Sequence, residues 1–164
     1  MIEPRQKIYD FSIIDPLKIF LKKKVDEKKL SSFFSEEFGF KNILTLSHGR
    51  LGIYLAVRAL INSEKNEIIL SPYTIIDVVN MVICAGGKPV FADINFPSIT
   101  ISTEEIKKKI NNNTAAIIMT HYQSYSENLS EIKIIAQKYN VKIIEDCAIV
   151  FGTKIKNKFV GGNL

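Results

Sequence analysis

The stretch VKIIEDCA, at residues 141–148, decides the fold class of this 164-residue chain. It is a short, almost continuous apolar run that ends in two adjacent carboxylates. A run of this kind is typical of a strand that is covered on both faces, as in a parallel sheet. A carboxylate directly after such a strand is costly to bury unless it is paired. One of the two therefore caps the next segment or meets a cation on a ligand, and the local pattern leaves both open.

Upstream of this stretch, strand-like runs alternate with helical patterns along most of the chain. Apolar runs predict strands at 43–46, 67–71, 89–93 and 115–120, in addition to 141–145. Helical spacing predicts helices at 51–60, 76–85, 103–110 and 129–139, and Ser102 with Glu105 has the form of a capping box. Residues 153–160 have the pattern of a small hairpin. The alternation predicts an α/β fold with a largely parallel sheet and helices on both faces.

The N-terminal part of the chain has a different pattern. Asp15 and Pro16 are typical of a helix start, and apolar residues at helical spacing predict a helix to about Leu30. We therefore expect two parts, namely an N-terminal arm and helix at 1–40 and the α/β domain at 41–164.

Composition excludes several classes of protein. The net charge is +5, but its lysines lie in stretches that are expected to be solvated faces, so no nucleic acid is predicted as a partner. No apolar run is long enough to span a membrane, and the start does not resemble a signal peptide, so a cytoplasmic location is expected. Cys84 and Cys147 suggest no disulfide framework, and no zinc-ligand spacing is present, so no metal is predicted.

Ligands of open α/β sheets bind beyond the carboxyl ends of the strands. The segments to inspect are 47–50, 71–75, 121–122 and 145–151. Gly49 and Arg50 open a helix, whose N-terminus suits phosphate, although an ordinary strand-to-helix turn has the same pattern. His121 is a candidate base or stacking residue, and a structural histidine is an equal alternative. No nucleophile pairs with it in sequence, so a hydrolase triad has little support.

Taken together, these strand ends resemble the DegT/DnrJ/StrS family of sugar aminotransferases, which are fold-type I enzymes that use pyridoxal phosphate (PLP). The resemblance extends from about Phe38 to the last residue. Its strongest element is 143–148, which is close to the family's IEDxA segment. Supporting similarities are Gly49-Arg50, the segment 71–74, the segment 85–94, Thr114 to Ile118 before His121, and the closing hairpin.

The resemblance assigns roles by position. Asp146 matches the aspartate that pairs with the protonated pyridine nitrogen of PLP, and Gly49 and Arg50 match the loop that receives the cofactor phosphate. Ile75 and Ile149 occupy two further cofactor-facing positions, and His121 is assigned to substrate binding. The family acts on a nucleotide-linked keto-sugar with an amino-acid donor, in polysaccharide or antibiotic sugar biosynthesis. It also implies a homodimer with active sites at the subunit interface.

Three departures from the family pattern narrow this expectation. The family usually has Gln or His where this chain has Ile149, and many members carry an aromatic residue where it has Ile75. The Schiff-base lysine of the family lies beyond residue 164, and lysines such as Lys154 match no catalytic position. We therefore expect a partial large domain, truncated and inactive alone.

Two further readings stay open. One is a non-catalytic binding or assembly module derived from the same fold, and the other is one half of a split enzyme. An unrelated nucleotide-binding domain is disfavoured, because no glycine-rich fingerprint follows the first strand.

Overall fold

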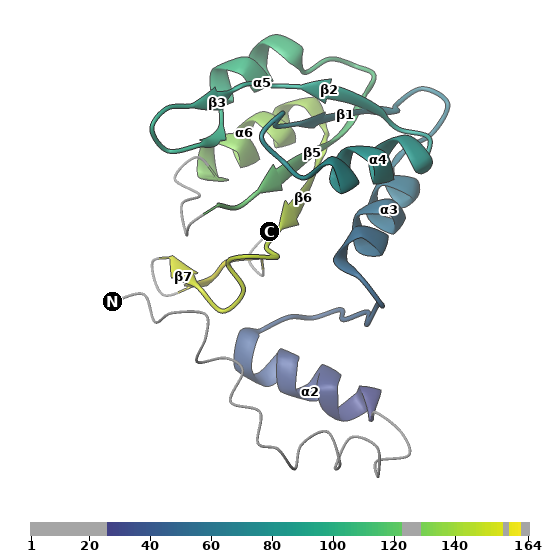
Figure 1. Cartoon of the computed structure of the whole chain (residues 1–164), viewed down its shortest axis with the longest axis vertical. Coiled ribbons are helices and arrows are strands. Elements are labelled where there is room, and N and C mark those ends of the chain that lie inside the picture. The colour runs from purple at the N-terminus through teal and green to yellow at the C-terminus, as the bar shows by residue number, and fades with distance from the viewer. Residues whose placement is uncertain (1–25, 123–128, 156–157, 162–164) are drawn as a thin grey trace. The chain divides into compact units, whose positions relative to one another are not determined.

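The computed structural model describes residues 26–122, 129–155 and 158–161 (Figure 1). The chain divides into two compact units, residues 1–43 and 44–164. The sequence led us to expect a division after residue 40. Most of the expected helix at 16–30 lies outside the described residues.

The first unit contains helix α2 (Glu27–Phe38). Asp26 caps its N-terminus by accepting a hydrogen bond from the Lys29 backbone N–H at 3.2 Å. Gly39 ends it in the left-handed conformation, with φ 73°, which glycine adopts without strain. The helix overlaps the expected one only at 27–30, so the prediction of a helix end near Leu30 is wrong. Its ring contacts involve Phe33, Phe34, Phe38 and Phe40.

The second unit is built on a four-stranded parallel sheet in the order β2-β1-β5-β6. The strands are β1 (Glu67–Leu70), β2 (Lys88–Phe91), β5 (Thr114–Thr120) and β6 (Lys142–Asp146). Strand β5 lies in the centre, and its last residue, Thr120, is paired with Asp146 of β6. The predicted parallel sheet is confirmed, and Asp146 is the last residue of its strand.

Four helices cover the two faces of this sheet. They are α3 (Gly49–Leu60), α4 (Ile76–Cys84), α5 (Thr103–Lys109) and α6 (Leu129–Tyr139). Ile106 and Ile132, from α5 and α6, pack against Ile117 on one face. On the other face, Val57 and Val82 from α3 and α4 belong to the cluster of Ile68 and Ile118. Each of these side chains is almost fully buried and stabilises the fold by roughly 1.5–3 kcal/mol.

The helix start expected at Ser102 is confirmed, and a pair of glycines follows the end of α4. Ser102 caps α5, and its hydroxyl accepts a hydrogen bond from the Glu105 backbone N–H at 3.3 Å. Gly86, after α4, has φ 89°, and a Cβ on the neighbouring Gly87 would lie 3.1 Å from the Val82 carbonyl oxygen. The turn therefore needs glycine for both its backbone angle and its close packing.

The strand predicted at 43–46 is wrong. Residues 43–46 form no strand in the described part of the chain, and Leu44 and Leu46 are exposed. The apolar run alone was not sufficient, because none of the described strands pairs with it.

Two small antiparallel pairs complete the described part of the second unit. The pair β3 (Ile94–Asn95) and β4 (Thr100–Ile101) was not predicted, because two-residue strands leave no periodic pattern. The pair β7 (Lys154–Ile155) and β8 (Lys158–Phe159) confirms the closing hairpin. Residues 156–157, between its two strands, lie outside the described residues.

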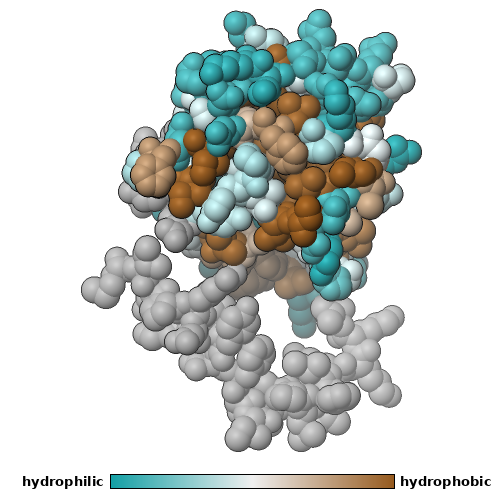
Figure 2. All heavy atoms as spheres, turned by 45° about the horizontal axis from the view of Figure 1, so that its top comes forward, coloured by the Kyte–Doolittle hydropathy of each residue, from teal (hydrophilic) through white to brown (hydrophobic). Residues whose placement is uncertain are grey.

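The surface mixes polar and apolar side chains. Figure 2 shows hydrophilic side chains over much of one face, interrupted by hydrophobic ones. Exposed large apolar side chains of the second unit include Tyr73, Ile75, Ile76, Ile83 and Phe91. None of the described helices combines the length and the apolar character needed to cross a lipid bilayer.

Candidate functional site

Three neighbouring strands bring their C-terminal ends to one edge of the sheet. Strands β1, β5 and β6 are adjacent and parallel, so the segments that follow them meet at this carboxyl edge. These segments are 71–75, 121–122 and 147–151, and they include most of the predicted site. This edge is where ligands of open α/β sheets bind.

The alternation of side chains along β6 separates its two carboxylates. Ile143 packs against the α5/α6 face of the sheet, and Ile144 packs against the α3/α4 face. Successive residues of a strand point to opposite faces. Glu145 therefore belongs to the α5/α6 face, and Asp146 belongs to the α3/α4 face.

Asp146 is half-buried at the end of β6. Its Oδ1 accepts a hydrogen bond from the Ala148 backbone N–H at 3.1 Å, which is the local capping role that the sequence left open. In the described part of the chain, no lysine, arginine or histidine forms an ion pair with Asp146. The carboxylate keeps a second oxygen that can receive a hydrogen bond from a ligand.

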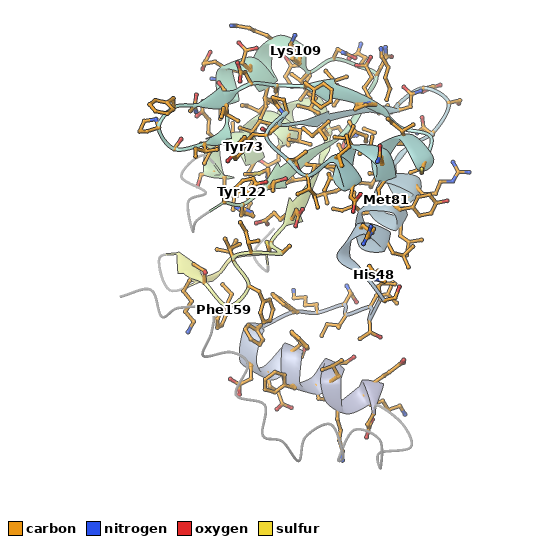
Figure 3. All side chains as sticks on the ribbon, viewed as in Figure 1. His48, Tyr73, Met81, Lys109, Tyr122 and Phe159 are labelled. Carbon is orange, nitrogen blue, oxygen red and sulfur yellow. The ribbon has the colours of Figure 1, made fainter. Side chains whose placement is uncertain are left out.

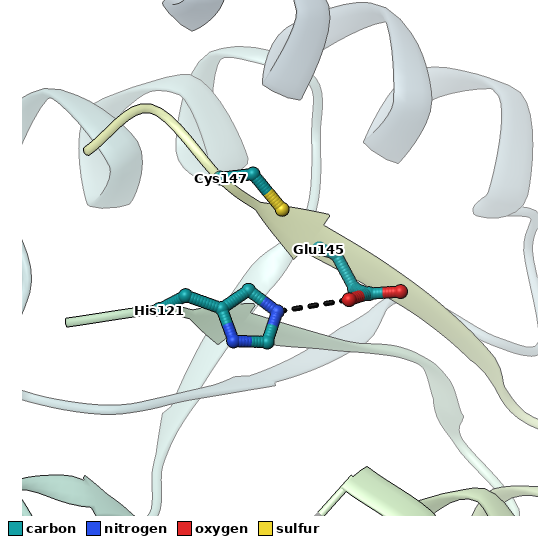
Figure 4. Close-up of side chains that lie close together, drawn as sticks. All are labelled: His121, Glu145 and Cys147. Atoms are coloured by element: carbon teal, nitrogen blue, oxygen red, sulfur yellow. Dashed lines mark hydrogen bonds and ion pairs between the residues drawn. The ribbon is translucent and has the colours of Figure 1, made fainter. Parts of the chain in front are cut away.

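His121 and Glu145 form a buried pair on the other face (Figure 4). His121 Nε2 lies 2.9 Å from Glu145 Oε2, and the two side chains are 3% and 4% exposed. The His121 backbone N–H also donates to the Asp146 carbonyl oxygen at 3.0 Å. The geometry favours a structural histidine that ties the ends of β5 and β6 together, and its role in substrate binding stays a prediction.

Glu145 is not fully satisfied by this pair. Its Oε1 is buried and has no hydrogen-bond partner among the described residues. The Cys147 thiol lies nearby, and burial, followed by the charges of Glu145 and Asp146, raises its pKa to about 12. One ligand-type atom from each of His121, Glu145 and Cys147 lies within 4.8 Å of the others. This proximity has no signal in the sequence, because the histidine is far from the other two residues in the chain.

The start of α3 has the features expected of an anion site. His48 makes no side-chain capping bond, and the Leu51 backbone N–H donates to the His48 carbonyl oxygen at 3.1 Å, so the backbone N–H groups of Gly49 and Arg50 can meet an external acceptor. A Cβ on Gly49 would meet nothing within 4 Å in the described part. Arg50 donates to Asp77 Oδ2 at 2.7 Å, and both side chains are partly exposed. Arg50 is thus paired, a feature that its position in the sequence did not predict.

Ile75 and Ile149 lie at this edge as exposed apolar side chains. Ile75 is the N-cap residue of α4 and is 61% exposed, and Ile149 is 44% exposed. Their assignment to the cofactor stays a prediction. Neither side chain offers a hydrogen bond or an aromatic ring.

Tyr73 and Tyr122 form an aromatic pair at the same edge, and both are labelled in Figure 3. Their ring centroids are 5.1 Å apart with an interplanar angle of 57°. Burial, with Tyr73 and Asp146 as smaller causes, raises the pKa of Tyr122 above its ordinary value. Both tyrosines lie in the segments expected at the site, but neither was given a role, since a lone tyrosine after a strand carries no distinctive signal.

Comparison with known proteins identifies a family of aminotransferases. The profile of the DegT/DnrJ/EryC1/StrS aminotransferase family matches residues 20–163. A GDP-perosamine synthase from Escherichia coli O157:H7 is 34% identical over 134 residues, which are 82% of this chain and 37% of that protein. A GDP-perosamine synthase from Vibrio cholerae is 32% identical over 128 residues, 78% of this chain and 35% of that protein. The chain thus spans about a third of the length of these relatives.

Solved structures show the same fold. Helicobacter pylori PseC, an aminotransferase involved in the biosynthesis of pseudoaminic acid, superposes with a TM-score of 0.82 and 22% identity. The match covers 98% of this chain and 43% of PseC. A GDP-4-keto-6-deoxymannose-3-dehydratase (ColD) has a TM-score of 0.73 and 24% identity over 82% of this chain and 36% of its own. The architecture of the second unit is that of fold-type I PLP enzymes.

Proposed function

We propose, from the premise that this chain belongs to the DegT/DnrJ/EryC1/StrS aminotransferase family, that it forms part of a PLP-dependent sugar aminotransferase. The enzyme would transfer an amino group from an amino acid to a nucleotide-linked keto-sugar. The proposal includes a homodimer in the cytoplasm. The GDP-perosamine synthases among its relatives support the substrate class.

The residues at the carboxyl edge fit PLP in two respects. Asp146 is a half-buried carboxylate with no cation beside it in the described part, and a pyridine nitrogen that carries a proton is a suitable partner. The uncapped start of α3, with open space above Gly49, suits a phosphate. When bound, the cofactor supplies an electron sink for the transfer of the amino group.

The observation that carries the proposal is the position of Asp146. At the end of β6, its carboxylate would hold a proton on the ring nitrogen, because a nearby negative charge favours the protonated form. The His121–Glu145 pair on the opposite face keeps the ends of β5 and β6 in register and so orients this carboxylate.

Gly49 and Arg50 would bind the phosphate. The backbone N–H groups of Gly49 and Arg50, at the start of α3, would donate to its oxygens, and the helix dipole favours its negative charge. Arg50 would add a cation, shared with Asp77. These contacts fix the cofactor at its end remote from the reacting carbon, and such positioning lowers the barrier to reaction.

We predict that the 164-residue chain alone does not catalyse the transfer. None of its lysines matches the position that attaches the cofactor in the family. The test is to incubate the chain with PLP, reduce it with borohydride and map the modified peptides. We expect only weak labelling of surface lysines, unchanged in an Asp146→Asn variant. A single lysine whose labelling depends on Asp146 would contradict the prediction.

A second candidate is one half of a split enzyme or a non-catalytic assembly module. Its support is the exposed apolar character of Ile75, Ile76 and Ile149 at the carboxyl edge. A surface of this kind suits another protein chain. Purification of the tagged chain from its own cells distinguishes the two: a companion chain that carries the lysine indicates a split enzyme.

A further inference from the structure

Tyr73 is held at the carboxyl edge by its own loop. Its backbone N–H donates to Ser71 Oγ at 2.9 Å, which fixes the turn directly after β1. The next residue, Thr74, lies with its Oγ1 at 3.4 Å from Thr120 Oγ1, so the loop is also tied to the end of β5. The ring of Tyr73 nevertheless remains 51% exposed. A fixed but exposed ring is suited to contact with a ligand, because little conformational entropy remains to be lost.

Tyr122 follows the end of β5 and lies near Asp146, whose charge is one of the causes that raise the pKa of the Tyr122 hydroxyl. Thr120 is paired with Asp146, and the His121 backbone N–H donates to the Asp146 carbonyl oxygen, so Tyr122 directly follows the point where the two strands meet. Thr120, the last residue of β5, lies on the same face as its partner Asp146, whereas His121 contacts Glu145 of the other face. Among the described residues, the Tyr122 hydroxyl has no hydrogen-bond partner, and its ring contacts Tyr73.

We propose that Tyr73 and Tyr122 form an aromatic wall for the planar ring of the cofactor, beside the carboxylate of Asp146. This inference rests on the proposed function. A protonated pyridine ring is planar and positively charged, and the face of a phenol ring attracts such a cation. The wall also supplies aromatic surface that the exposed aliphatic side chain of Ile75 does not.

The binding of pyridoxine phosphate to the 164-residue chain tests this inference. This probe has an alcohol in place of the aldehyde, so it cannot attach to lysines. The chain contains no tryptophan, so its intrinsic fluorescence comes from its six tyrosines. We expect binding to quench that fluorescence and to be weakened about three- to tenfold in Tyr73→Ala and in Tyr122→Ala.

The conservative variants separate a ring contact from a structural role. Tyr122→Phe keeps the ring and is expected to bind within about twofold of the unchanged chain. Tyr122→Leu keeps apolar volume without a ring, replaces the alanine variant if that unfolds, and is expected to show the same loss. The matched control is Tyr139→Ala, at the end of α6, which is expected to leave binding unchanged. Thermal unfolding midpoints of all variants are measured alongside.

Two failures are distinguishable. If Asp146→Asn weakens binding but Tyr73→Ala and Tyr122→Ala do not, the proposal of an aromatic wall is wrong, whereas the proposed cofactor site is retained. If the unchanged chain shows no binding that depends on Asp146, the proposed cofactor site fails, and the aromatic wall fails with it.

Discussion

Each of the two edges of the parallel sheet carries a buried glutamate. The two glutamates differ in how many of their carboxylate oxygens have a hydrogen-bond partner. At the amino edge, Glu67 begins β1, and both of its carboxylate oxygens have a partner. Oε1 accepts from Lys88 Nζ at 2.9 Å, and Oε2 accepts from Asn111 Nδ2 at 2.8 Å. At the carboxyl edge, Glu145 has one oxygen on His121 and the other without a partner in the described part.

The contrast extends to the side chains around each glutamate. The partners of Glu67 come from β2 and from the loop after α5, so they join three segments. Around Glu145, the neighbouring Asp146 has no cation beside it in the described part, and Tyr73 and Ile75 are exposed. At the amino edge, the Glu67 carboxylate has its hydrogen-bond partners within the chain. The carboxyl edge keeps polar and exposed groups that an external partner can contact. This difference is expected if stability is concentrated at one edge and ligand binding at the other.

The largest expected effect is on binding at the carboxyl edge. Asp146→Asn removes a charge but keeps the shape, and it should weaken the binding of pyridoxine phosphate by about ten- to a hundredfold. That range corresponds to the roughly 1.5–3 kcal/mol of a hydrogen bond to a charged group. Calorimetric titration measures the loss. The free energy of unfolding should change little, because in the described chain the carboxylate has no ion-pair partner to lose. A loss of stability without a loss of binding would contradict the comparison.

The opposite result is expected at the amino edge. Glu67→Ala leaves Lys88 and Asn111 without their partner and should lower the free energy of unfolding by roughly 1–3 kcal/mol. Urea denaturation followed by circular dichroism measures this change. Binding of pyridoxine phosphate to the folded variant should stay the same. Lys88→Ala is the matched control. The Lys88 side chain is 67% exposed, so this substitution should lower the free energy of unfolding by less, at most about 1 kcal/mol.

The sequence predicted the strands that form the two edges of the sheet, but not the side-chain contacts at these edges. Strands β1, β5 and β6 were found because each is a short apolar run between helical patterns, and the position of Asp146 at a strand end followed directly. The Glu67–Asn111 contact could not be predicted, since it depends on the order of strands in the sheet. The same holds for the His121–Glu145 pair and for the contact between Tyr73 and Tyr122.

Two errors show where pattern alone misleads. The apolar run at 43–46 resembles a strand, but a strand exists only when a neighbour pairs with it, and the local sequence carries no information about neighbours. Conversely, α2 has no buried residue, so the apolar periodicity that marks most helices was not a reliable guide. Asp26 and Gly39, its two capping residues, were the available signals.

The smallest expected effect is the dependence of the amino edge on pH. The hydrogen bonds from Lys88 and then Asn111 lower the pKa of Glu67 below its ordinary value of 4.5, against the effect of burial. A carboxyl whose pKa is lowered on folding stabilises the fold above its unfolded pKa, and that contribution is lost as pH falls through the folded pKa. Stability should therefore decrease below about pH 4.5.

Glu67→Gln isolates this contribution, because its amide keeps the shape and does not titrate. The unchanged chain should be more stable than Glu67→Gln at neutral pH, by on the order of 1 kcal/mol, since a hydrogen bond to a charged group is stronger than a neutral one. The gap should close as pH falls below 4.5, and added salt should narrow it at neutral pH because Lys88 is exposed. Urea denaturation at several pH values measures the gap. A gap that is constant with pH would show that Glu67 is not held as a charged group, and the amino edge would then owe its stability to packing.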